Sequence, residues 1–168
     1  IVAIGDIHGD FRAIIRSLKI AGVIPLNTPE NNKIDVNKIS WTGGKTIVVQ
    51  LGDQVDRFRP TNWYNGCVDE HIPIDEGSDV KIINLLDNLN IKARKVGGGV
   101  VSIFGNHELM NVDGDFRYVS LNEFEEFGKV LSDSNKNNCD PEYPFGHKER
   151  KMAFAPGGIL ANRLANTR

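Results

Sequence analysis

The chain has 168 residues, and 40% of them are hydrophobic, which is enough to bury the core of one domain. Its 20 basic and 22 acidic residues leave a formal net charge of -2, so charge gives no reason to expect nucleic acid or an anionic membrane as partner. No apolar run reaches the roughly 18 residues of a membrane-spanning helix. The two cysteines, Cys67 and Cys139, form no CxxC pair, which favours a reducing, cytoplasmic compartment.

Three short apolar runs predict buried strands. They cover residues 1–4 (IVAI), 46–51 (TIVVQL) and 100–104 (VVSIF), and they are rich in β-branched residues with little polar alternation. This pattern is typical of a largely parallel sheet covered on both faces. Each run is followed by glycine and then Asp or Asn. Because ligands of open α/β sheets bind at the carboxyl ends of the strands, we expect these polar residues to converge there.

Helical segments alternate with the strands. Residues 10–21 and about 78–95 place apolar side chains on one face, which predicts a helix after each of the first two strands. Ser120 and Glu123 have the spacing of a capping box before a third predicted helix, residues 121–131. An edge hairpin is expected at 31–41. The alternation predicts an α/β fold.

Two stretches, 58–77 and 132–151, are predicted to be surface insertions because they combine glycine, proline or asparagine with scattered polar residues. The first directly follows the second strand-end motif, where a loop can shape substrate access. His71 and His147 lie in these stretches, and we expect both to be solvated.

The strand ends carry three motifs: GDIHGD at residues 5–10, GDQVDR at 52–57 and GNHE at 105–108. Asp6 and His8 are two residues apart, so in an extended segment both face one cation. Asp53 can bridge that cation to a second one about 3.5–4 Å away, as two-metal hydrolysis requires. Asn106 would ligate the second ion. These oxygen and imidazole donors suit two Mn, Fe or Zn ions.

The remaining roles of phosphate-ester hydrolysis also have candidates. Arg57 offers a planar, bidentate fit to phosphate oxygens, and we expect it to bind the substrate together with Asn106. His107 can protonate the leaving oxygen, and Asp56 can accept a hydrogen bond from its other ring nitrogen. For Glu108 we expect that it favours a helix N-terminus or orients the loop, rather than a direct role in catalysis. A single Gly-Asp after a strand is usually only a turn, and the prediction rests on three motifs in order.

These motifs resemble the GDxHG, GDxVDRG and GNHE hallmarks of phosphoprotein phosphatases in the calcineurin-like metallophosphoesterase family. Residues 105–120 and 152–165 resemble the Shewanella-like branch of that family. The resemblance implies a metallophosphatase-type αββα sandwich of mixed, largely parallel sheets flanked by helices, with residues 1–168 in one domain. It also implies a Ser/Thr or Tyr phosphoprotein substrate and the same metal and catalytic residues.

The sequence departs from the family pattern at two points. Phe58 stands where a glycine usually follows the arginine. The family also supplies two further histidines for the second metal, one in an HGG-like motif. None of the four histidines in this chain matches it, so we expect those ligands beyond Arg168, in a longer protein.

Two other functions remain open on the sequence. A small-molecule phosphoesterase, such as a dinucleoside polyphosphate hydrolase, carries the same three motifs. A metal-binding or interaction domain without activity is the second alternative, and it is favoured if the chain ends at Arg168 in the cell.

Overall fold

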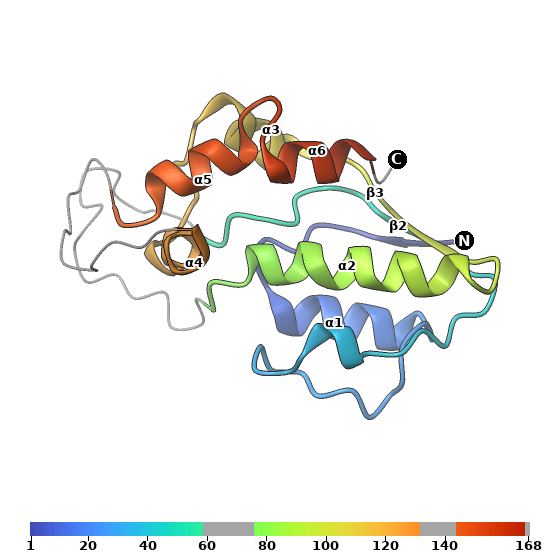
Figure 1. Cartoon of the computed structure of the whole chain (residues 1–168). Helices are drawn as coiled ribbons and strands as arrows, with labels where there is room; N and C mark the ends of the chain where they lie inside the picture. The colour runs from blue at the N-terminus through green and yellow to red at the C-terminus, as the bar shows by residue number, and fades with distance from the viewer. Residues whose placement is uncertain (59–75, 132–143, 167–168) are drawn as a thin grey trace.

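The computed structural model describes residues 1–58, 76–131 and 144–166 (Figure 1). Its elements, in chain order, are β1 (Val2–Ile4), α1 (Phe11–Ile20), the 3-10 helix η1 (Val36–Lys38), β2 (Ile47–Gln50), α2 (Asp79–Arg94), β3 (Gly99–Ser102), α3 (Asn106–Asp113), α4 (Leu121–Leu131), α5 (His147–Phe154) and α6 (Ile159–Asn166). Among the described residues, no helix is both long and apolar enough to cross a membrane.

The three strands form one parallel sheet with β2 in the centre. Val2 of β1 lies opposite Val48 of β2, and Val48 lies opposite Val100 of β3. Since all three strands run in the same direction, their carboxyl ends share one edge of the sheet. The predicted parallel sheet is therefore confirmed, and it brings the three strand-end motifs to the same side of the molecule.

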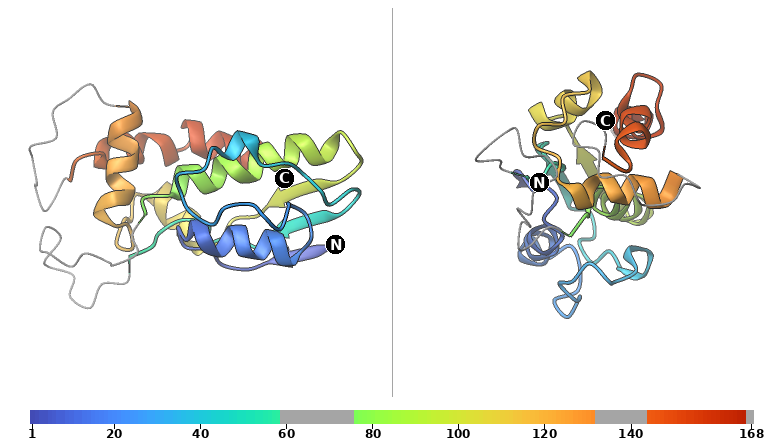
Figure 2. Two further views of the ribbon diagram at one scale, coloured as in Figure 1. Left: turned by 90° about the horizontal axis from the view of Figure 1, so that it is seen from below. Right: turned by 90° about the vertical axis from the view of Figure 1, so that its left-hand side faces the viewer.

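Helices cover both faces of the sheet. α1 and α2 lie on one face, and α3, α5 and α6 lie on the other (Figure 1). The views of Figure 2 show the same arrangement and place α4 beyond the carboxyl ends of the strands. The α/β fold with a sheet flanked by helices is thus confirmed, and α4 borders the edge that carries the motifs.

The larger core fills the space between the sheet and the first two helices. Phe11, Ile14, Ile15 and Leu18 form one face of α1, and each of these side chains is fully buried. Burying an aliphatic or aromatic side chain of this size contributes about 1.5–3 kcal/mol, so this face fixes α1 on the sheet. A second cluster lies among α2, α4, α5 and α6, and it contains Val55, Ile83, Phe127, Ala153, Phe154, Leu160 and Leu164.

Helix ends follow the sequence expectation closely. The side chain of Asp10 caps α1 by accepting a hydrogen bond from the Ala13 backbone N–H at 2.8 Å. The capping box of α4 is also formed: Ser120 N donates to Glu123 Oε2 at 2.8 Å, and Glu123 N donates to Ser120 Oγ at 3.1 Å. Such caps satisfy backbone groups that the helix itself leaves without partners.

The hairpin expected at 31–41 is wrong, because the segment contains η1 and no strand. Asp35 caps this short helix by accepting from Asn37 N at 3.0 Å. Lys92 Nζ then donates to the carbonyl oxygens of Asn37 and Ile39, each at 2.6 Å. The segment is therefore fixed by its own short helix and by Lys92 of α2 instead of by pairing with a strand.

The structure describes only parts of the two predicted insertions. Most of 58–77, including His71, and residues 132–143 lie outside the described residues. The last part of the stretch 132–151 is not irregular, since α5 begins at His147 after Gly146 in a left-handed conformation with φ of 90°. The irregular structure expected for residues 147–151 is therefore wrong, while the assignment of 132–151 as an insertion stays a prediction.

Candidate functional site

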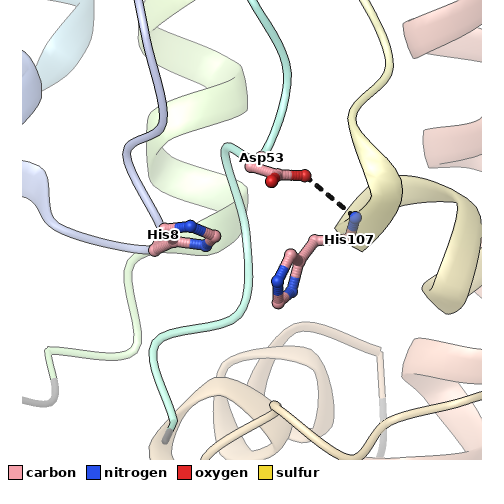
Figure 3. A group of neighbouring side chains, drawn as sticks. All are labelled: His8, Asp53 and His107. Carbon is pink, nitrogen blue, oxygen red and sulfur yellow. Dashed lines mark hydrogen bonds between the residues drawn. The ribbon is translucent and has the colours of Figure 1, made fainter.

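Three side chains from three strand-end loops meet at the carboxyl edge of the sheet. Ligand atoms of His8, Asp53 and His107 all lie within 4.8 Å of one another, and Figure 3 shows the three side chains around a common space. His8 follows β1, Asp53 follows β2, and His107 begins α3 after β3. Asp53 and His107 are buried, and His8 is half-buried. The convergence expected from the parallel sheet is therefore present.

Two glycines let the loops approach this closely. Gly52 has φ of 92°, and a Cβ atom there would collide with the backbone of Gly105. A Cβ atom on Gly105 would collide with the carboxylate of Asp53. Only glycine fits both positions without displacing the loops. The glycines of the Gly-Asp and Gly-Asn motifs are therefore required by the close packing of the loops as well as by the turn at Gly52.

Backbone strain is concentrated in the same loops. The non-glycine residues of the described chain with positive φ are His8 at 48°, Asp53 at 52° and Asp56 at 72°. A left-handed conformation costs such a residue on the order of 1–3 kcal/mol, and it persists only where the surroundings enforce it. Here His8 N donates to Asp53 O at 2.8 Å. Strain at three neighbouring polar residues is typical of a functional site.

The ring of His8 is oriented as a metal ligand requires. Its Nδ1 lies 3.3 Å from the carbonyl oxygen of Val55. Because a carbonyl only accepts, Nδ1 carries the hydrogen in this contact and Nε2 carries the lone pair. Asp6 Oδ2 lies 3.8 Å from that Nε2, and the Asp6 side chain is 63% exposed. The two side chains therefore lie side by side at the exposed side of the site, although His8 has φ of 48° and the segment is not extended as the spacing argument assumed.

Asp53 is held from two sides. Its Oδ1 accepts a hydrogen bond from His107 N at 2.9 Å, the contact that Figure 3 draws. The buried carboxylate of Glu108 accepts from the backbone N–H groups of Asp53, Gln54 and Gly105 at 2.7–2.8 Å. Burial raises the pKa of Glu108, and its backbone hydrogen bonds oppose that shift. Glu108 thus orients the loop, as expected from the sequence.

His107 and Asp56 form a buried pair. His107 Nδ1 lies 2.9 Å from Asp56 Oδ2, and the two side chains are 8% and 0% exposed. Nδ1 donates, since a carboxylate accepts. Asn111 Nδ2 donates to both oxygens of Asp56, at 2.9 and 3.0 Å. The rings of His8 and His107 are 4.6 Å apart, so the pair lies directly beside the candidate metal ligands.

Arg57 and Asn106 lie at the border of the site. Arg57 Nη1 contacts Asp10 Oδ2 at 3.1 Å, and the arginine side chain is 20% exposed. Its backbone N–H donates to Glu123 Oε1 at 2.7 Å, and Phe58 N donates to Tyr118 O at 2.9 Å. Asn106 is exposed at the first position of α3. Both residues are therefore accessible to a ligand.

The sequence prediction missed a buried charged cluster behind Asp56. Arg150 of α5 is fully buried, and its Nη2 donates at 2.8 Å to Asp56 Oδ1 and to Asp79 Oδ2. Glu123 lies in the same cluster, and burial raises the pKa of both Asp79 and Glu123. The one available signal is the spacing of Arg150 with Ala153 and Phe154 at i, i+3 and i+4.

The expectation of a solvated His147 is wrong. Its ring is half-buried and lies 5.1 Å from the ring of Phe116 and 5.6 Å from that of Phe124. Burial lowers the pKa of His147. His147 therefore packs α5 against Phe116 and Phe124, whereas His8 and His107 lie at the strand ends.

Relatives of the chain include protein phosphatases. Shewanella-like protein phosphatase 2 of Arabidopsis thaliana is 38% identical over an alignment of 189 positions. The alignment covers 98% of this chain and 41% of that protein. Shewanella-like protein phosphatase 1 of Plasmodium berghei is 31% identical over 170 residues, covering 99% of this chain and 38% of that protein. The chain therefore spans about two fifths of the length of these relatives.

Solved structures share the fold. A cold-active protein tyrosine phosphatase superposes with a TM-score of 0.52 at 20% identity, over 91% of this chain and 36% of that one. The phosphatase of this kind from a psychrophilic Shewanella species gives a TM-score of 0.51 at 19% identity, with the same coverage. The calcineurin-like phosphoesterase family matches residues 1–166. With the match extending over almost all of its length, the chain belongs to the calcineurin-like phosphoesterase family.

Proposed function

We propose that the chain carries the catalytic loops of a phosphomonoester hydrolase that acts on phosphoproteins with two metal ions. The observation that carries this proposal is the convergence of His8, Asp53 and His107 within 4.8 Å, with the buried Asp56 behind His107. Family membership supports the reaction class, and the three strained loop residues support a preorganised site.

The donor set fits metal ions. The tautomer of His8 directs an imidazole lone pair from Nε2, beside the exposed carboxylate of Asp6. We assign Asp6, His8 and Asp53 to one ion, and Asp53 with Asn106 to the other. Oxygen and imidazole donors suit Mn, Fe or Zn. When bound, such ions supply Lewis acidity for the phosphoryl group and for the attacking water.

The protein residues supply binding and proton transfer. Arg57 binds the phosphoryl oxygens with its planar guanidinium, exchanging its contact with Asp10 for the substrate. As the oxygen of water bonds to phosphorus and the ester P–O bond breaks, the leaving oxygen keeps the bonding electron pair and takes a proton from Nε2 of His107. The attacking water releases a proton to solvent, from which Nε2 is protonated again. The products are an alcohol or phenol and inorganic phosphate. Asp56 holds the His107 ring in the orientation that this transfer needs.

Phosphoproteins are the proposed substrates because the relatives described above carry the name protein phosphatase. The test is a comparison of kcat/KM in the Mn-loaded full-length protein for phosphoserine, phosphothreonine and phosphotyrosine peptides and for a dinucleoside polyphosphate. We expect turnover of at least one phosphopeptide to exceed that of the dinucleotide. Preference for the dinucleotide would support a small-molecule phosphoesterase, and no turnover of any substrate would support an inactive domain.

A further inference from the structure

Asp56 depends on a residue that lies 94 positions away in the chain. Arg150 Nη2 donates to Asp56 Oδ1 at 2.8 Å, and both side chains are fully buried. Two other groups make three contacts with the same carboxylate: His107 Nδ1 lies 2.9 Å from Oδ2, and Asn111 Nδ2 donates to Oδ1 at 2.9 Å and to Oδ2 at 3.0 Å. The carboxylate is therefore surrounded by donors and cannot rotate without losing one of them.

Arg150 is itself held in one place. Its Nη2 also donates to Asp79 Oδ2 at 2.8 Å, and its Nε donates to Asn111 Oδ1 at 2.7 Å. The guanidinium lies over the rings of Phe127 and Phe154, with its carbon 5.0 and 5.2 Å from the ring centres. Nη2 thus contacts Asp56 directly, and Nε contacts Asn111, which itself binds Asp56. The two aromatic rings hold the guanidinium in this position.

We infer that Arg150 is a positioning residue for proton transfer: from α5 it fixes Asp56, and through Asp56 the ring of His107. The inference rests on the proposed function. Arg150 touches neither the substrate nor the metal ligands, so it is not a catalytic residue. A planar guanidinium is suited to this task because it can bind Asp56, Asp79 and Asn111 at once in a fixed geometry.

A lysine cannot replace it. Its single nitrogen cannot reproduce the separate Nε and Nη2 positions that contact Asn111 and Asp56. Arg150→Lys keeps the positive charge but should let Asp56 and His107 move, and misplacement of a reacting group by about 1 Å can cost 10²-fold in rate. Arg150→Met, in contrast, removes the positive charge and leaves Asp56 and Asp79 buried without a cation. This variant can fail to fold, so Arg150→Lys is the one to test.

The test measures kcat and KM of the Mn-loaded full-length protein with aryl phosphates whose leaving groups range from acidic to weakly acidic phenols. For Arg150→Lys we expect kcat to fall about 10–100-fold for the poorest leaving group, to change little for the best, and to leave KM and metal content unchanged. Arg163→Met removes the 2.7 Å contact between Arg163 of α6 and Asp87 of α2, and it should keep the leaving-group dependence of the wild type.

A second control separates positioning from stability. Leu160→Ala opens a cavity in the core cluster of α6 and should lower the melting temperature without changing the leaving-group dependence. If Arg150→Lys behaves like Leu160→Ala, with a lower melting temperature and a uniform loss of kcat, the positioning role is overturned.

An activity-free readout tests the positioning of the His107 ring separately from the proposed function. In metal-free protein with ¹⁵N-labelled histidine, Arg150→Lys should shift the ring signals of His107, and Arg163→Met should leave them in place. Unchanged His107 signals would overturn the inference even if the protein is an active phosphatase. A wild type without turnover would reject the proposed function instead, and a His107 shift would then still show that Arg150 positions the ring.

Discussion

Asp56 Oδ2 lies 2.9 Å from His107 Nδ1, and neither side chain has more than 8% of its surface exposed. Asp56 achieves this contact in a left-handed conformation with φ of 72°. The contact links the loop after β2 to the start of α3. It also fixes a hydrogen of His107 on Nδ1, so Nε2 is the nitrogen that we expect to exchange a proton with the substrate.

His107→Asn tests whether this residue donates a proton. We expect kcat to fall about 10²–10⁴-fold, most strongly for poor leaving groups, because general acid catalysis contributes that much. Metal content, measured by plasma mass spectrometry, should stay at the wild-type value.

Loss of metal in His107→Asn would show instead that His107 is a ligand, as its position within 4.8 Å of His8 and Asp53 allows. An equal loss of rate for all leaving groups would also contradict the general-acid role. The matched control is His147→Asn, which changes a histidine packed between Phe116 and Phe124 and should keep the metal and the leaving-group dependence.

Arg57→Met tests the phosphate clamp. Charge-assisted hydrogen bonds contribute about 1.5–3 kcal/mol, so kcat/KM for phosphomonoesters should fall about 10–100-fold with little change in melting temperature. Arg12→Met is the control, because Arg12 is 59% exposed on α1 and contacts only Glu30 among the ion pairs of the described residues. Equal kcat/KM in the two variants would exclude Arg57 from substrate binding.

Glu108→Gln tests the support of Asp53. The glutamine keeps the size of the side chain but turns an acceptor into an N–H₂ donor that faces the backbone N–H groups of Asp53 and Gly105. An unsatisfied buried group costs about 1–3 kcal/mol, so urea unfolding should show a loss of that size, together with weaker metal binding. Glu149→Gln on α5 should change stability by less than about 0.5 kcal/mol. Wild-type stability in Glu108→Gln would refute the role.

Glu126 gives a pH dependence of stability. Burial, followed by the charge of Asp79, raises the pKa of Glu126 to about 8 from 4.5. The folded protein then holds a proton that the unfolded chain releases, so stability is full below pH 4.5 and decreases as the pH rises towards 8. The melting temperature of the wild type should therefore fall across this range more than that of Glu126→Gln.

Glu125→Gln is the matched control for this titration. Glu125 is the neighbouring residue on α4, is 40% exposed, and contacts Lys129 at 2.8 Å. Its variant should show the same decrease in melting temperature as the wild type. A Glu126→Gln variant with the wild-type pH profile would contradict the raised pKa.

The sheet and the approach of the loops were predictable from local sequence. Uninterrupted apolar runs predicted three buried parallel strands, and glycines such as Gly52 indicated sharp exits at their carboxyl ends. The contact of His107 with Asp56 was also expected, because a proton-donating histidine needs a hydrogen-bond acceptor at its other ring nitrogen. These features depend on short-range chain geometry and on the shared edge of a parallel sheet.

The charged cluster was not predictable in the same way. Arg150 stands in the sequence HKERKMAF, whose composition is that of a solvated helix. Its burial depends on carboxylates 71 and 94 positions away, at Asp79 and Asp56, and on the rings of Phe127 and Phe154. The spacing of Arg150 with Ala153 and Phe154 indicates a shared helix face, but it does not indicate these distant partners. The hairpin expected at 31–41 failed for a similar reason, because Lys92 of α2 binds its carbonyl groups.

Metal stoichiometry of Asp53→Asn tests the central claim most directly. The carboxylate of Asp53 is the proposed bridge between the two ions, and Asp87→Asn, which alters the partner of Arg163, is the matched control. After loading with Mn and removal of unbound ions, we predict two ions per wild-type and Asp87→Asn full-length protein, and fewer than one per Asp53→Asn. Wild-type metal content in Asp53→Asn would contradict a two-metal centre built on this residue.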